Sequence, residues 1–404
     1  MTQIEQMIQD MCPNGVEWKT LGEVCDFKRG STITANQTED GCIPVIAGGQ
    51  KPAYYHNQSN REGKNITVAG SGAYAGYVAY WELPIFVSDA FTVTPKDSSL
   101  NIKYLYYFLT SIQDKIYHTK KGSGVPHVHP SSIFSFEIPL PPLEIQNRIV
   151  EILDRFSALA AELQAELQAE LQMRRKQYEY YRTRLLTPHS ESDSTDNTDD
   201  ATSSSWQWKT LGEIGTFQRG NGLQKKDFTE EGVGCIHYGQ IYTRLGTFCN
   251  ETITRVPKEL AEKLVKVYKG NLVIACTSEN VEDCCKAVAW LGDETIVTGG
   301  HSAVFRHNEN PKYIAYAFQS EIFQKQKNKF AKGVKVIDIK IEELAKIKIP
   351  LPSLPEQARI VAILDKFEAL TTSLSDGIPA EQIAQQRRYE YYRDKLLSFP
   401  GKPE

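Results

Sequence analysis

Two long stretches of the chain carry apolar residues in alternating steps of three and four, which is the spacing of one face of a helix. In the first stretch these positions are Ile149, Leu153, Phe156, Ala160, Leu163 and Leu167. In the second they are Ile360, Leu364, Phe367, Leu370, Leu374 and Ile378. The pattern predicts two long helices, over residues 142–186 and 355–398, with a kink near 377–379, where Gly377 and Pro379 interrupt the second.

The first predicted helix has the composition of a rod. Ala-Glu-Leu-Gln occurs three times between Ala161 and Gln172, and all four residue types favour helix. About 45 residues at 1.5 Å each give a length of roughly 65 Å. Because a long helix with a single apolar stripe needs a partner, we expect the two helices to pack as an antiparallel coiled coil.

Outside these helices, shorter alternating runs predict strands, each group followed by a shorter helix. In the first half the predicted strands precede a helix over 101–117 and are Ile66–Ala69, Gly76–Tyr80 and Ala90–Val93. In the second half they precede a helix over 312–330 and are Leu272–Cys276, Lys286–Trp290 and Ala303–Arg306. We therefore expect an α+β protein with two globular α/β domains, residues 1–141 and 206–354.

A polar segment, residues 187–205, separates the first helix from the second domain. Its residues 190–200 hold five acidic side chains and no basic one. This composition predicts a disordered tether. The five charges also account for the net charge of −4, since the rest of the chain carries +1. A chain close to neutral can still bind DNA if its basic residues cluster.

The sequence contains an internal duplication, which we interpret as a pseudo-twofold repeat. Residues 17–30 recur 190 positions later with nine of 14 residues identical. Residues 138–156 recur 211 positions later with 13 of 19 identical, and residues 178–186 recur at the same distance with seven of nine identical. The connector therefore has one fixed length in both copies, whereas the domains differ in length by 21 residues.

Length and composition exclude several classes of protein. A chain of 404 residues is too long for one ordinary core, and no apolar run approaches the roughly 20 residues of a membrane span. The N-terminus lacks the apolar centre of a signal peptide, so we expect a cytoplasmic protein without a membrane partner. The eight cysteines form no C-x-x-C pair, and we expect them to be small buried hydrophobic residues.

Catalytic motifs are missing from the sequence. It contains no phosphate loop, no H-E-x-x-H, no G-x-S-x-G and no N-P-P-F-like motif of amino-methyltransferases. Gly70-Ser71-Gly72 is better explained as a tight strand turn than as a glycine loop for phosphate. His127 and His129 lack a third ligand, which favours a structural or DNA-facing role over a metal site. We expect no catalytic residue, metal or cofactor in this chain.

Basic residues that recur in both domains are the first candidates for contact with DNA. Lys28, Arg29 and Gly30 close the first repeated block, and Arg219 and Gly220 close its second copy. An arginine before glycine would let the guanidinium and the backbone both approach a phosphate. A solvated surface turn explains the Arg-Gly pair equally well.

Two basic loops occupy matching late positions, each after a helix. We favour a DNA-facing loop over a merely solvated one for both, with the candidates Lys120, Lys121, Gly122, Ser123, Lys332, Gly333 and Lys335. The remaining candidates lie nearby in sequence or add positive charge, and they are Tyr54, Tyr74, His127, Lys225 and Lys226. For the two tyrosines, packing in a core is an equal alternative.

Both predicted helices end in Tyr-Glu-Tyr-Tyr-Arg. Three tyrosines in four residues cannot all fit one coiled-coil seam, and tyrosine and arginine are common anchors of protein interfaces. A protein partner and packing within the chain are equal alternatives. The residues proposed for a partner are Tyr178, Tyr181, Arg182, Tyr389, Tyr392 and Arg393.

Taken together, the chain resembles the specificity subunits of type I restriction-modification enzymes. The resemblance rests on Trp18-Lys-Thr-Leu-Gly-Glu, on Ile138-Pro-Leu-Pro-Pro-Leu with Gln146, Arg148-Ile-Val and Ile152-Leu-Asp, and on the second copies of these motifs. The four-residue repeat at 161–172 and the ending Leu396-Leu-Ser-Phe-Pro are similar to those of one subgroup of the family. The resemblance covers nearly the whole chain.

The resemblance implies a function without catalysis in this chain. Each domain would be a target recognition domain that reads one half of an asymmetric, bipartite DNA sequence, with a gap of roughly six or seven base pairs if the half-site centres lie one turn apart. The helices would set the spacing and dock two modification subunits, which would methylate adenine with S-adenosylmethionine. Restriction subunits would use ATP and Mg²⁺ to translocate and cut unmodified DNA.

Two other classes of function remain as alternatives. A non-catalytic coiled-coil adaptor with twin protein- or glycan-binding domains would need neither basic loops nor salt-dependent affinity for DNA. A catalyst in its own right would need a catalytic constellation that the sequence does not contain.

Overall fold

The computed structural model describes residues 3–122, 124–188, 206–333, 336–372 and 377–399. The chain divides into two compact units, and the first is made of two separate stretches of sequence, Met1–Gln168 and Glu381–Glu404. The second unit is Ala169–Ala380. Each unit therefore combines one globular domain, part of the helix that follows it, and the end of a helix from the other copy of the repeat.

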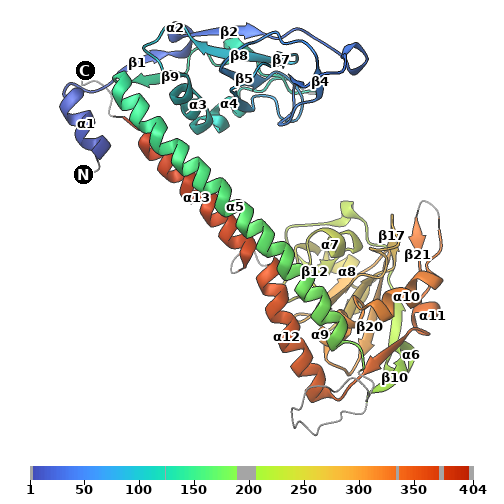
Figure 1. Cartoon of the computed structure of the whole chain (residues 1–404). Helices are drawn as coiled ribbons and strands as arrows, with labels where there is room; N and C mark the ends of the chain where they lie inside the picture. Colours follow the sequence, from blue (N-terminus) through green and yellow to red (C-terminus); the bar gives the residue numbers. More distant parts are fainter. Residues whose placement is uncertain (1–2, 123, 189–205, 334–335, 373–376, 400–404) are drawn as a thin grey trace. The chain divides into compact units, whose positions relative to one another are not determined.

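The first domain is built on a four-stranded antiparallel sheet (Figure 1). In spatial order its strands are β2 (Cys25–Arg29), β8 (Ala90–Pro95), β5 (Asn65–Ala69) and β6 (Val78–Trp81). A three-stranded sheet contains β4 (Tyr54–His56), β3 (Ile43–Ile46) and β7 (Phe86–Val87), and a further pair joins β1 (Glu17–Thr20) to β9 (Glu137–Leu140). The helices of this domain are α1 (Gln3–Met11), α2 (Leu21–Val24), α3 (Ile102–Ser111) and α4 (Gln113–His118).

The second domain repeats this plan with additional strands. Its main sheet contains β11 (Gly215–Arg219), β20 (Ser302–His307), β16 (Leu272–Ala275), β18 (Ala287–Trp290) and β13 (Phe248–Cys249). A second sheet contains β14 (Thr254–Val256), β12 (Val233–Ile236), β19 (Ile296–Thr298) and β15 (Val265–Val267). Two short pairs join β10 (Gln207–Thr210) to β22 (Lys348–Leu351) and β17 (Thr277–Ser278) to β21 (Ile337–Asp338).

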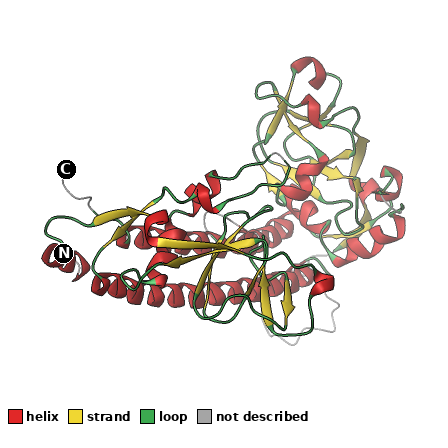
Figure 2. Cartoon of the chain, turned by 90° about the horizontal axis from the view of Figure 1, so that it is seen from above, coloured by secondary structure: helices red, strands yellow, loops and turns green. Residues whose placement is uncertain are grey.

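Six short helices complete the second domain, and strands and helices intermingle along the chain in both domains (Figure 2). The helices are α6 (Leu211–Ile214), α7 (Tyr238–Thr243), α8 (Lys258–Ala261), α9 (Pro311–Ala317), α10 (Glu321–Phe330) and α11 (Ile341–Leu344). The predicted α+β class is confirmed.

The long helices run antiparallel within each unit (Figure 1). They are α5 (Leu143–Leu185), α12 (Leu354–Thr372) and α13 (Ile378–Leu396). In the first unit α13 lies along α5, where the hydroxyls of Tyr389 and Ser157 are 2.9 Å apart. In the second unit Phe367 of α12 stacks on Tyr181 of α5 at 5.3 Å between ring centroids. The antiparallel arrangement is thus as predicted.

The second predicted long helix is two helices. The predicted interruption is present, because α12 ends at Thr372 and α13 begins at Ile378 with Pro379 in its first turn. Residues 373–376, and residues 189–205 of the predicted tether, lie outside the described part of the chain.

Two shorter predicted helices were wrong in extent, because each is divided in two. The helix predicted over 101–117 breaks at Ile112, where the amide side chain of Gln113 binds the carbonyl of Gly76 and the backbone N–H of Val78. The helix predicted over 312–330 breaks before Ser320, whose hydroxyl accepts from the N–H of Phe323 and caps α10. The strand predicted from Gly76 begins at Val78.

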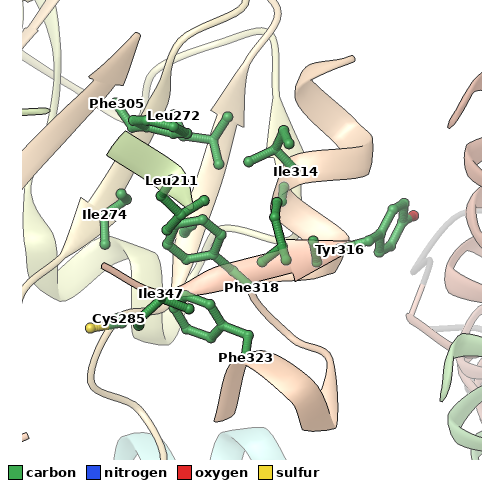
Figure 3. Packing of buried hydrophobic residues seen from close by; sticks show 14 of the residues in the cluster. Leu211, Leu272, Ile274, Cys285, Phe305, Ile314, Tyr316, Phe318, Phe323 and Ile347 are labelled. Carbon is green, nitrogen blue, oxygen red and sulfur yellow. The ribbon is translucent and has the colours of Figure 1, made fainter. Parts of the chain in front are cut away.

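Each domain has its own core, and both cores include the helix that follows the domain. In the second domain, phenylalanine and aliphatic side chains from the main sheet, α9 and α10 interdigitate (Figure 3). Tyr316 turns its hydroxyl away from this cluster toward α12, where the oxygen lies within hydrogen-bond distance of the carboxylates of Asp365 (2.8 Å) and Glu368 (2.6 Å), which share its one proton. Burial and these carboxylates raise the pKa of Tyr316.

The repeated sequence motifs form the same joint between domain and helix twice. In the first unit Gln146 is buried and binds the N–H of Asn101 and the carbonyls of Ser99 and Pro141. In the second unit the equivalent Gln357 makes two of the same bonds, to the N–H of Asn310 and the carbonyl of Pro352, and its third bond goes to the carboxylate of Glu309. The motif thus locks each helix against its own domain.

The repeated aspartate of Ile-Leu-Asp completes the joint. Asp154 accepts from Lys103 (2.9 Å) and from the hydroxyl of Tyr107 (2.7 Å). Asp365 accepts from Lys312 (2.6 Å) and Tyr316 in the same way. A buried or half-buried tyrosine and lysine thus find their partner on the helix, which explains why these motif residues recur together.

Most of the cysteines are buried, as expected. Five are buried inside the domains, namely Cys25, Cys235, Cys276, Cys284 and Cys285. Cys12 and Cys249 are half-buried, and the expectation was wrong for Cys42, which is exposed just before β3.

Candidate DNA interface

The residues just after β5 and β16, the central strands of the two domains, make the same pattern of backbone hydrogen bonds. We call this pattern the frame. In the first domain the N–H of Gly70, just after β5, donates to the carbonyl of Asp89, and the N–H of Val128 donates to the carbonyl of Gly70. In the second domain Cys276 donates to His301 and Ile339 donates to Cys276 in the same pattern. The register of β8 on β2 and of β20 on β11 makes the same residues equivalent.

A basic hairpin closes this frame in each domain. Lys121 and His127 exchange two backbone hydrogen bonds, and Lys332 and Asp338 do the same. Gly122 (φ +110°) and Gly333 (φ +136°) follow the lysines in a backbone conformation that favours glycine. The two loops predicted to match are therefore equivalent in structure. Two of their candidates, Ser123 and Lys335, lie outside the described residues.

The side chains of the first hairpin differ in exposure. Lys121 and His127 are exposed. Lys120 is half-buried: its ammonium lies 4.3 Å from the centre of the Tyr117 ring and donates to the carbonyl of Ala73 (3.2 Å). Val125 at the tip of the hairpin is 56% exposed, and Val336 is 57% exposed at the same place in the second domain. Both loops thus present a lysine and an apolar tip.

The two matching arginines are held differently. Arg29 is exposed beside Lys28, and its guanidinium lies 3.1 Å from Nδ1 of His129. Arg219 instead forms an ion pair with Asp338 (2.6 Å) and donates to the carbonyl of Ile339 (3.0 Å). Arg29 therefore presents its guanidinium at the surface, whereas Arg219 anchors β21 to the end of β11.

The predicted role of the glycines after these arginines was wrong. The backbone N–H of Gly30 donates to the carbonyl of Ala90, and that of Gly220 donates to Ser302, so neither is free for a phosphate. A Cβ at Gly30 would lie 2.2 Å from the carbonyl oxygen of Ser88, and one at Gly220 would lie 2.7 Å from Cα of Gly299. Close approach of neighbouring backbone explains both glycines.

The two candidate tyrosines of the first domain lie at the surface. Tyr54 begins β4 and is 38% exposed, and Tyr74 lies in the turn just after Gly72 and is 48% exposed. Neither packs in the core of the first domain. Gly70–Gly72 were expected to form a tight strand turn; Ser71 instead pairs with His127 and the N–H of Gly72 donates to the carbonyl of Pro126, and the turn between β5 and β6 lies just after them, at residues 73–76.

Lys225 and Lys226 are exposed on a short 3-10 helix, Lys225–Asp227. Burial and the positive charge of Lys225 lower the pKa of His237, whose ring lies 4.5 Å from that of Tyr238. Tyr238 in turn contacts the ring of His301 edge-on at 5.0 Å. The chain of rings links His237, which senses the charge of Lys225, to His301 of the frame.

Several side chains of the frame were not among the sequence-based candidates. They are Ser71, Asp89, Thr277, His301 and Asp338. They lie between the repeated blocks, where the distance between equivalent residues changes from 190 (Arg29 and Arg219) to 212 (Phe91 and Ala303). No single alignment of the two halves brings them together, so the sequence offered no signal for them.

The residues proposed for a protein partner divide into two groups. Tyr178 and Tyr181 pack on Phe367, and the guanidinium of Arg182 lies over the ring of Tyr178 at 5.1 Å. Tyr389 binds Ser157 through its hydroxyl. For these residues the structure shows packing within the chain, the alternative left open by the sequence.

Other tyrosines of the same motifs remain at the surface. Tyr392 is 44% exposed and contacts Phe156 edge-on at 6.0 Å, while Arg393 pairs with Asp394. Tyr180 and Tyr391, the middle tyrosines of the two motifs, are 59% and 63% exposed. Close to Tyr392 in the first unit, a groove of about 510 Å³ is lined by Phe156, Leu159, Leu163, Tyr389 and Tyr392.

Metal chemistry has no obvious place in the described part of the chain. His127 and His129 stack in parallel with 6.1 Å between ring centroids. No group of three or more His, Cys, Asp or Glu side chains there is arranged to hold a metal ion. Among the same residues, no helix combines the length and the hydropathy that crossing a lipid bilayer requires.

Comparison with known proteins identifies the family. The family model described as "Type I restriction modification DNA specificity domain" matches residues 13–173 and again residues 203–382. A type I restriction enzyme specificity subunit of Escherichia coli is 30% identical over 96% of this chain and 95% of its own length. A putative type I specificity subunit of Haemophilus influenzae is 29% identical over 95% of this chain and 96% of its own.

A solved structure supports the fold. A chain from a study of complex assembly and conformational transition of the type I R-M system matches with a TM-score of 0.62, at 18% identity, over 95% of this chain and 97% of that one. The double match of the family model agrees with the internal repeat. The chain therefore belongs to the type I restriction-modification DNA specificity family, whose members are DNA-recognition subunits and not the catalytic ones.

Proposed function

We propose that each domain reads one half of an asymmetric, bipartite DNA sequence through the surface around its hairpin frame. The observation that carries this proposal is the recurrence of one backbone frame with an exposed lysine, Lys121 or Lys332, at the same corner. The residues around the frame differ between the domains, which supports two different half-sites. Lysine and arginine at the rim supply contacts to phosphates, which position a protein on DNA without reading its sequence.

The helices hold the two reading domains at a fixed spacing in this proposal. The continuous 43-residue α5 supports that role, as does the fixed length of the connector in both copies. One helical turn between half-site centres corresponds to a gap of about six or seven base pairs. Two modification subunits dock on the helices, and the exposed Tyr180, Tyr391 and Tyr392 are candidate contacts.

The chemistry belongs to the partner subunits. The modification subunits use S-adenosylmethionine to methylate adenine, and restriction subunits use ATP and Mg²⁺ to move along and cut unmodified DNA. The test is to co-express the chain with its modification subunit and to map methyladenine in the host DNA. We expect one split, asymmetric motif. Absence of any methylated motif, with the complex formed and the methyltransferase intact, would support the adaptor alternative.

Replacement of Lys121 or Lys332 by alanine is expected to weaken binding of the complex to DNA of every sequence alike. Loss of one phosphate contact lowers the slope of log K against log salt by about 0.9. Lys64 and Lys269 are matched controls, since each is an exposed lysine just before β5 or β16, at the opposite end of the strand from the hairpin. A titration of affinity against salt concentration measures the effect, and an unchanged slope for both hairpin variants would count against these loops.

Removal of one Ala-Glu-Leu-Gln unit from residues 161–172 is expected to change the preferred gap and leave both half-site sequences as they are. Four residues shorten a helix by about 6 Å and turn it by about 40° beyond one full turn. Methylation mapping of the two-unit variant beside the parent measures this directly. The same preferred gap in both proteins would show that the helices do not set the spacing.

A further inference from the structure

Both frames contain a hydroxyl, a carboxylate and an imidazole, but the carboxylate and the imidazole occupy exchanged positions in the two domains. Next to the hydroxyl of Ser71, the first domain has a carboxylate at position 89 and an imidazole at 127. Next to the equivalent Thr277, the second domain has an imidazole at position 301 and a carboxylate at 338. Backbone hydrogen bonds fix both equivalences, since Gly70 donates to the carbonyl of residue 89 as Cys276 donates to that of residue 301.

We propose that Asp89 and His301 each read one base of a half-site, by accepting a hydrogen bond from the exocyclic amino group of a cytosine or an adenine. This inference rests on the proposed function and assigns the equivalent position in both domains as specificity-determining. Acceptors on side chains read the amino groups of these bases in the major groove.

The exposed carboxylate of Asp89 suits the edges of bases better than phosphates. It is exposed just before β8, where Phe91 pairs with Arg29, and the backbone bonds of Gly70 join it to the end of the hairpin of Lys121. A carboxylate repels phosphates, so on a surface whose rim binds the DNA backbone its free oxygen has to face base edges. The hydroxyl of Ser71 donates to one carboxylate oxygen, Oδ2, and leaves the other to accept from the DNA.

The hydrogen-bond network makes His301 an acceptor as well. Asp338 can only accept, so the hydroxyl of Thr277 donates its proton to that carboxylate (2.8 Å). The oxygen of Thr277 then accepts from Nδ1–H of His301 (3.1 Å). In the neutral ring Nε2 therefore carries the free lone pair. His301 is exposed, so this nitrogen is open to a ligand.

Both reading side chains are fixed before DNA arrives. Each is tethered by a hydroxyl at the end of the central strand, and His301 is also packed edge-on against Tyr238. The ion pair of Arg219 with Asp338 holds the network of the second domain in place. A group held in one orientation discriminates between bases better than a solvated lysine, because less ordering is needed on binding.

The test begins with the methylation motif of the wild-type complex. The affinity of complexes carrying Asp89→Ala or His301→Ala is then measured for oligonucleotides in which each base pair of the motif is replaced in turn. We expect the ratio of affinities for the correct and the replaced base pair to fall about 5- to 10-fold at one position in each variant. The base pair affected by Asp89→Ala and the one affected by His301→Ala should lie in different half-sites. Asp26→Ala, which removes an exposed carboxylate at the second residue of β2, at the far end of the strand from Arg29, is the control and should leave the motif unchanged.

Two further variants keep the test decisive if an alanine variant does not fold. Ser71→Ala keeps the carboxylate and removes its tether, and should give a smaller loss at the same base pair. Asp89→Asn keeps the shape and adds a donor, and should relax that base pair. A wild-type complex without any motif would overturn the proposed function itself. A normal wild-type motif with full discrimination in the Asp89 and His301 variants, or losses confined to one half-site, would overturn this inference alone.

Discussion

Leu397→Ala is expected to destabilise the first unit by about 2 to 5 kcal/mol and to leave the second unit unchanged. Leu397 follows α13 at the end of the second copy of the repeat, yet it is 5% exposed in the core of the first domain, together with Phe399. Its removal leaves a cavity there. Since a domain is stable by only about 5 to 15 kcal/mol, this is a large share of the total.

The matched control is its counterpart in the first copy. Leu186, which follows α5, is 1% exposed in the core of the second domain. Leu186→Ala is therefore expected to destabilise the second unit alone, by a similar amount. Hydrogen exchange measured peptide by peptide separates the two effects. Faster exchange in the second unit of Leu397→Ala, or in the first unit of Leu186→Ala, would contradict this assignment of the two ends.

Gln146→Leu should be comparably severe, with a loss of about 3 to 5 kcal/mol in the stability of the first unit. Leucine has a similar volume, but it leaves the N–H of Asn101 and the carbonyls of Ser99 and Pro141 without the partner that Gln146 supplies. Each buried polar group left without a partner costs about 1 to 3 kcal/mol. Denaturant unfolding of the complete chain, followed by hydrogen exchange of the first unit, measures the loss.

Gln164→Leu provides the comparison on the same helix. Gln164 is exposed on α5, and a surface exchange of this kind changes stability by no more than about 0.5 kcal/mol. Gln357→Leu should reproduce the large effect in the second unit, because Gln357 makes the equivalent bonds to Asn310 and Pro352. Equal stability of Gln146→Leu and Gln164→Leu would show that the repeated glutamine is not a structural joint.

Local patterns predicted the elements that depend on sequence spacing. The apolar stripe of α5, the interruption before α13 and the strands β5, β8, β16 and β20 all follow from periodicity, because a helix or strand exposes its faces at a fixed repeat. Periodicity failed where a tertiary contact overrides it. The bond from Gln113 to Gly76 ends α3, and no local pattern records a partner 37 residues away.

The candidate interface was predicted in part. The matching hairpins at Lys121 and Lys332 were visible because they keep the 211-residue offset of the helical blocks. Arg29 and Arg219 were visible at an offset of 190, but their different partners were not. The sequence does not show whether an arginine faces solvent or an aspartate. The ion pair of Arg219 with Asp338 joins residues 119 positions apart, and no local pattern records it.

The sequence by itself determined the duplication, the class of the fold, the two long helical regions and the family, because each of these is carried by the identity of residues and by their spacing along the chain. Only the tertiary structure decided which copy of the repeat completes which domain, with Leu397 in the first core and Leu186 in the second. It also decided that Asp89 and His301 occupy one equivalent position. Both results depend on contacts between distant segments, whose geometry is set by sheet register and core packing and leaves no regular spacing in the sequence.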